Sequence, residues 1–110
     1  MTAFQEVVRN NGWIISKTEK GYELGKLTRQ KFPARGRFMF SIQETAEETP
    51  AAAVKRYAVE FDIDKYVDMW MTSRNSGCAG VPKFGKLVQD AEEIKHHLME
   101  LASALAAAGL

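Results

Sequence analysis

An apolar stripe near the C-terminal end of the chain is the feature that most constrains its fold. Its seven members are separated by alternating steps of three and four positions: Phe84, Leu87, Ala91, Ile94, Leu98, Leu101 and Leu105. That spacing puts all seven side chains on one face of an α-helix. Because such a helix must bury its apolar face, we expect it to pack against the rest of the domain.

The composition indicates one globular domain, residues 1–110, with 45% hydrophobic residues and a net charge of +1. No apolar run approaches the roughly 18 residues that a membrane-spanning helix needs. The N-terminal residues lack the basic and apolar regions of a signal peptide. A single cysteine, Cys78, has no partner for an internal disulfide. We therefore expect a cytoplasmic protein that does not associate with membranes.

Upstream of the stripe, three stretches have the composition of β-strands, namely residues 13–18, 22–27 and 37–42. Residues 19–21 between the first two are typical of a hairpin turn, since Gly21 adopts conformations that other residues avoid. The third stretch alternates cleanly, which puts Phe38, Phe40 and Ile42 on one face.

The segment from Lys55 to Phe61 is open to two interpretations. As a strand it has Tyr57, Val59 and Phe61 on one face. As a helix it would begin near Pro50 and continue from Ala51 to Val59, because its three consecutive alanines favour helix. We favour the strand.

These elements together predict an α+β domain. Its antiparallel sheet has about four strands, two C-terminal helices pack on one face, and a short helix over residues 3–10 precedes the sheet. The residues expected in its core are Phe38, Phe40, Ile42, Tyr57, Val59, Phe61, Trp70, Ile94 and Leu98.

The end of the stripe also has two interpretations. Leu101 and Leu105 lie in an alanine-rich tail and either project as a protein interface or are covered within the chain. In the first case the chain forms a weak homodimer through this helix. In the second it is a monomer whose N-terminal helix covers the stripe through Phe4, Val7 and Val8. Met69 and Met71 flank Trp70 and form a second candidate protein interface.

Histidines and acids give little indication of a metal or catalytic site. His96 and His97, with Cys78, are the one candidate metal cluster, but adjacent helical residues point about 100° apart and so do not chelate one ion. Asp62, Asp64 and Asp68 suit the positive end of a helix dipole and lack the spacing of a calcium loop. The chain contains no phosphate-binding loop, nucleophile elbow or HExxH motif. We therefore expect no catalytic residue, metal or cofactor.

A basic segment over residues 26–37 is the candidate nucleic-acid-binding site. It contains five cations and no acid: Lys26, Arg29, Lys31, Arg35 and Arg37. Phe32 and Phe38 lie among them, so the cations would contact phosphates while an exposed aromatic ring stacks on a base. The segment lacks the Gly-aromatic signature of an RNA-recognition strand.

Two stretches carry a resemblance to known proteins. One is the run from Tyr57 to Asp64 followed by Trp70, and the other is Gly80-Val81-Pro82 followed by Leu87 and Asp90-Ala91-Glu92. In these stretches the chain resembles small accessory proteins of bacterial conjugative elements and prophages. That group has no established activity, so the resemblance implies a bacterial cytosolic protein and assigns no site residue.

The sequence therefore favours a non-enzymatic binding or adaptor domain that contacts another protein. This expectation rests on the continuous stripe, the methionines beside Trp70 and the lack of a catalytic motif. The alternative is a nucleic-acid-binding accessory protein that uses the basic segment 26–37.

Overall fold

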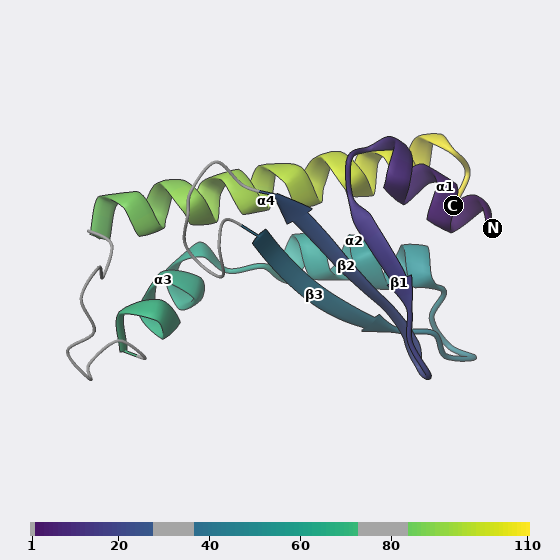
Figure 1. The fold of residues 1–110 in the computed structure, drawn as a ribbon, viewed down its shortest axis with the longest axis horizontal. Helices are drawn as coiled ribbons and strands as arrows, with labels where there is room; N and C mark the ends of the chain where they lie inside the picture. The colour runs from purple at the N-terminus through teal and green to yellow at the C-terminus, as the bar shows by residue number, and fades with distance from the viewer. Residues whose placement is uncertain (1, 28–36, 73–83) are drawn as a thin grey trace.

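A computed structural model describes residues 2–27, 37–72 and 84–110. Its elements, in chain order, are α1 (Ala3–Asn10), β1 (Ile14–Lys17), β2 (Gly21–Leu27), β3 (Arg37–Gln43), α2 (Pro50–Glu60), α3 (Ile63–Thr72) and α4 (Phe84–Ala107). The described strands form one antiparallel sheet in the order β1-β2-β3. The predicted α+β class is confirmed (Figure 1).

The sheet has one apolar face and one solvent-exposed face. The tight β1–β2 turn is closed by the Thr18 N–H, which donates to the Gly21 carbonyl at 2.9 Å. In the β2–β3 register Leu24 lies opposite Phe40 and Gly25 lies opposite Met39. The buried set is Ile15, Tyr22, Leu24, Phe38, Phe40 and Ile42, and the alternate residues Ile14, Ser16, Glu23, Met39 and Ser41 are exposed. This period of two is what a half-buried sheet requires.

Two helices cover the apolar face of the sheet. Helix α2 packs against both β3 and α4, and α3 packs against α4. Figure 1 shows α4 running the length of the molecule beside α2, with the sheet in front. The helical layer is therefore made by α2 and α4, so the prediction that the two C-terminal helices, α3 and α4, form it is wrong in this detail.

The predicted strand from Lys55 to Phe61 is wrong, and the helical interpretation is confirmed. Thr49 caps α2, since its hydroxyl accepts the Ala52 N–H at 3.1 Å, and Pro50 begins the helix. The residues that α2 buries recur with helical spacing: Ala51, Ala53, Val54 and Ala58. This helical period and the N-cap outweigh the β-like composition of residues 57–61.

Val59, which was expected in the core, points outward as a consequence. Its side chain is 71% exposed, and Tyr57 and Phe61 are half-buried at the edge of the core. Phe38, Phe40 and Ile42, in contrast, are buried as predicted.

The stripe forms the buried face of α4. Its members from Leu87 to Leu105 are all at most 1% exposed, so this prediction is confirmed. Leu101 and Leu105 are fully buried within the chain, where α1 packs against α4 and adds Phe4 and Val8 to the same core cluster. The covered alternative is thus supported, and the expectation that this end projects is wrong.

The physical reason is that α1 is better fixed than its length suggests. The Thr2 hydroxyl accepts the Gln5 N–H at 3.2 Å, and the Gln5 side chain accepts the Thr2 N–H at 2.9 Å. This capping box satisfies backbone donors that the first turn leaves free. An eight-residue helix is thereby held in place to cover the end of the stripe.

Candidate functional site

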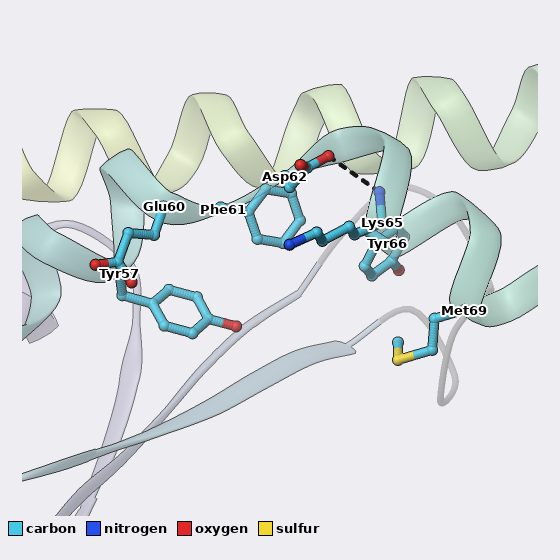
Figure 2. Close-up of a pocket in the computed structure, with 7 residues that line it drawn as sticks. All are labelled: Tyr57, Glu60, Phe61, Asp62, Lys65, Tyr66 and Met69. Carbon is cyan, nitrogen blue, oxygen red and sulfur yellow. Dashed lines mark hydrogen bonds between the residues drawn. The ribbon is translucent and has the colours of Figure 1, made fainter.

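A surface pocket opens where α2 ends and α3 begins. Its volume is about 320 Å³, and it is lined by Tyr57, Glu60, Phe61, Asp62, Lys65, Tyr66 and Met69. The aromatic walls are adjoining rings, with Phe61 at 6.4 Å from Tyr57 and 5.6 Å from Tyr66 between centroids. Figure 2 shows Tyr57 on one side of the pocket and Met69 on the other, with the Lys65 ammonium pointing between them.

The turn between the two helices builds this pocket. Phe61 ends α2 in an extended conformation, with φ −60° and ψ 116°. Asp62 then caps α3, since its Oδ1 accepts the Lys65 N–H at 3.0 Å (Figure 2). Asp62 therefore lies at the N-terminal, positive end of a helix, as the sequence predicted for this acid, and its side chain caps that end. The sharp change of direction brings the side chains of α3 beside the last turn of α2.

Lys95 on α4 fixes the last turn of α2 from behind. Its ammonium donates to the carbonyl of Ala58, to that of Val59 at 3.1 Å and to that of Phe61 at 3.2 Å. The final carbonyls of a helix have no partners within the helix and carry partial negative charge. The partly buried Lys95 ammonium thus satisfies three carbonyls at the C-terminal end of α2, and it holds the pocket wall against α4.

Two hydrogen-bond donors in the pocket remain available. Neither the Tyr57 hydroxyl nor the Lys65 ammonium bonds to any group of the chain that the structure describes. Partial burial raises the pKa of the Tyr57 phenol above its ordinary value, so the hydroxyl keeps its proton at neutral pH. Met69 is 53% exposed at the rim. The pocket therefore combines apolar walls with donors for a ligand oxygen.

A second pocket of about 320 Å³ shares the lining residue Tyr57 with the first. It is lined by Ser41, Ile42, Gln43, Thr45, Glu48, Ala53, Arg56 and Tyr57. Tyr57 lines both pockets, and its ring stacks on Phe40 of β3 at 4.3 Å between centroids and 16° between planes. The two pockets therefore share Tyr57. Residues of β3 line the second pocket, and Phe38 of β3 lies against Phe61 of the first, so we call the two pockets together the β3 groove.

The second pocket has a different character from the first. Arg56 donates to Glu48 through two nitrogens, at 2.8 and 2.9 Å, and this pairing lowers the pKa of the Glu48 carboxyl. Arg56 also lies 3.5 Å from Glu60. Its charge is therefore shared between two carboxylates, and this end of the groove is polar and close to neutral.

A buried carboxyl lies behind the first pocket. Asp90 on α4 is 1% exposed, and its Oδ2 accepts the Tyr66 hydroxyl at 3.0 Å. Its Oδ1 has no hydrogen-bond partner among the described residues. Burial raises the pKa of this carboxyl to about 6. Asp90 is not among the predicted site residues, because in the sequence it is a single polar position beside the stripe, three residues after Leu87.

The predicted nucleic-acid site is described at only two of its five residues. The Lys26 ammonium points into the domain, where it donates to the Asn11 carbonyl at 2.8 Å and lies 5.8 Å from the Trp13 ring. Arg37 begins β3 and pairs with Leu27 in the sheet register. The other three cations, Arg29, Lys31 and Arg35, lie outside the described residues. Lys26 therefore has an internal structural role.

The structure describes the side chains of three of the four predicted interface residues, namely Met69, Leu101 and Leu105. Met69 lines the first pocket, whereas the side chain of Met71 lies outside the described part of the chain. Leu101 and Leu105 are buried beneath α1, in the C-terminal part of α4. Figure 1 shows α1 and α3 at opposite ends of the molecule. Met69 is thus the one predicted interface residue that the structure places at a surface site.

The histidine rings lie close to acids of their own helix. His96 lies 3.3 Å from Glu100, and His97 lies 3.5 Å from Glu93 and 3.3 Å from Glu100. Across residues 2–27, 37–72 and 84–110, no group of three or more His, Cys, Asp or Glu residues is arranged to hold a metal ion. Cys78 lies outside these ranges.

Comparison of the chain with models of protein families, with curated proteins and with solved structures gives no match. None of the helices in the described ranges is long and apolar enough to cross a membrane. The site's own geometry is therefore the basis for a functional proposal.

Proposed function

We propose that this chain is a non-enzymatic binding domain that contacts another protein through the β3 groove. The observation that carries the proposal is the first pocket, with three aromatic walls, an exposed methionine and two available donors. Aromatic and methionine side chains around a concave, partly dry surface are typical of the central part of protein interfaces. The resemblance to accessory proteins of mobile elements is in keeping with such a role in the bacterial cytoplasm.

The charges along the groove favour a protein over a nucleic acid. Its acidic side chains are Glu48, Glu60 and Asp62, and its basic side chains are Arg56 and Lys65. Arg56 is already paired with carboxylates, so the groove offers no cluster of free cations for phosphates. Because Lys26 is turned inward, no described contact favours the alternative through the basic segment.

Site-specific photocrosslinking in the native host tests this proposal. A photoreactive amino acid replaces Met69 in the groove or, as a matched control, Met99, which is 43% exposed on α4 outside the groove. We expect one protein to be crosslinked from position 69 and not from position 99. The substitution Met69→Glu should abolish capture of that protein by the purified domain, whereas Met99→Glu should not.

Equal crosslinking from both positions would contradict the proposal, as would recovery of nucleic acid alone. Circular dichroism of each variant confirms that the domain is folded. Because both methionines are exposed, we expect neither substitution to change the free energy of unfolding by more than about 0.5 kcal/mol.

A further inference from the structure

We infer that the partner binds as an extended peptide strand added to the free edge of β3, with its alternate side chains in the β3 groove. This inference rests on the proposed function and names the form of the partner. The partner segment is a peptide of about seven residues, long enough to match β3, with a large apolar side chain for the first pocket.

The backbone of β3 offers unpaired groups at this edge. The described sheet ends at β3, which pairs only with β2 within it. The Glu44 N–H donates to the Lys20 carbonyl at 2.8 Å, which identifies that pair as hydrogen-bonded. Since such pairs alternate in an antiparallel ladder, Phe38, Phe40 and Ile42 bond to β2. The N–H and C=O groups of Met39 and Ser41 therefore point to the free edge.

Among the described residues, this edge lacks the proline, lysine and bulge that often protect a strand from pairing. The seven residues of β3 include no proline or lysine, and their pairing with β2 runs without a bulge from Arg37 to Gln43. An unprotected edge of this length readily accepts another strand. The opposite edge differs, because β1 has four residues, packs beside α1 and ends at Lys17.

The two pockets lie at the positions that an added strand would reach. Phe38 contacts Phe61 of the first pocket at 5.9 Å between ring centroids, and Ile42 lines the second pocket. These two β3 residues are four apart, which corresponds to about 13 Å of strand. Residues opposite Phe38 and Ile42 in an added strand would therefore project toward the first and second pockets. The residue opposite Phe40, midway between these two, would face Tyr57.

The character of each pocket sets the peptide pattern. The first has aromatic walls and Met69, so it suits a large apolar side chain. The second has the Arg56–Glu48 pair at its wall, so it suits a polar side chain that hydrogen-bonds to that pair. The available donors at Tyr57 and Lys65 suit a carbonyl or carboxylate oxygen beside the apolar residue.

A second copy of this chain fits the groove less well than a free peptide does. The β3 side chains that would project toward the pockets are Phe38, Phe40 and Ile42, each 6–7% exposed beneath the chain's own helices. Because those side chains are buried in the core of their own chain, they would not enter the two pockets of a neighbouring copy. A peptide has free side chains on that face and fills both pockets while it bonds to Met39 and Ser41.

Selection from a displayed library of random heptapeptides against the purified domain tests this inference. The tightest selected peptide is then synthesised, and its affinity is measured by fluorescence anisotropy. In a series of singly N-methylated peptides, methylation should weaken binding at least tenfold at alternate residues and leave the intervening residues near the parent affinity, because only alternate amides bond to an edge strand. This series changes the peptide alone, so the domain stays intact.

Proline substitutions in the domain provide the second measurement. Met39→Pro removes an N–H at the free edge without removing a bond to β2, and Pro is tolerated at such positions. We expect at least a tenfold loss of affinity. The matched control is Lys17→Pro at the opposite edge, for which we expect no loss.

The outcomes separate this inference from the proposed function. If N-methylation has no alternating effect while Met69→Glu still abolishes peptide binding, strand addition is wrong and the groove remains a protein site. The same holds if the library yields no binder but position 69 crosslinks a protein. Self-association that Met39→Pro abolishes would identify a second copy as the occupant and overturn the peptide. Failure of both crosslinking and selection overturns both proposals.

Discussion

The substitution Asp90→Asn should make the stability of this domain less dependent on pH. The Asp90 carboxyl is 1% exposed and has one oxygen without a partner among the described residues. Burial raises its pKa from 3.8 to about 6, whereas the hydrogen bond from Tyr66 acts in the opposite direction. Asparagine has almost the same shape and carries no charge at any pH. It therefore removes the ionisation without emptying the site.

The direction in which pH changes the free energy of unfolding depends on whether the folded or the unfolded state binds the Asp90 proton more tightly. The folded state binds it more tightly, so Asp90 destabilises the fold once the pH is above both pKa values. The rise from 3.8 to about 6 corresponds to a penalty of about 3 kcal/mol above pH 6. That penalty is absent below pH 3.8 and grows through the interval between the two values. Lowering the pH from 8 to 5 should recover about 1.4 kcal/mol of it.

Urea unfolding of the wild type and of Asp90→Asn at several pH values from 5 to 8 measures this effect. The quantity of interest is the difference between the two free energies of unfolding, because titrations of other groups cancel in it. This difference should shift by about 1.4 kcal/mol in favour of the wild type as the pH falls from 8 to 5. A flat difference for Asp90→Asn would refute the reasoning.

Three further predictions concern what holds the groove and the core in place, and urea unfolding followed by circular dichroism checks each. Lys95→Ala should cost about 1–3 kcal/mol, because it leaves the three carbonyls at the end of α2 without their donor, and a neutral result would contradict the capping role. Leu105→Glu should unfold the domain, since this side chain is fully buried beneath α1, whereas a folded variant would show that the end of the stripe is open. Gly21→Ala should destabilise far more than Gly25→Ala, because a new Cβ at Gly21 overlaps β3 backbone while one at Gly25 meets a flexible methionine end, and equal effects would contradict the register.

The sequence was sufficient where one strong period determined the structure. The stripe from Leu87 to Leu105 predicted the buried face of α4, and the alternation around Phe40 predicted a strand with one buried face. The period was ambiguous over residues 57–61, which alternate like a strand. There the deciding signals were upstream, in the Thr49 cap and the alanines that follow it.

The groove and the buried carboxyl were harder to predict because they depend on how elements meet. Nothing near Tyr57 in the sequence indicates that its ring stacks on Phe40 or that this residue lines two pockets. Asp90 and Tyr66 are 24 residues apart and become partners only when α3 packs on α4. Lys26 shows the converse, since a cation in a basic run is engaged by the C-terminal end of α1.

Amide hydrogen exchange with and without the selected peptide tests strand addition at β3 most directly. The N–H groups of Met39 and Ser41 point to the free edge, so they should exchange rapidly in the free domain. Saturating peptide should slow the exchange of both by at least tenfold, while Phe40, already bonded to β2, should change much less. Unchanged exchange at Met39 and Ser41 in a domain saturated with peptide would contradict the account.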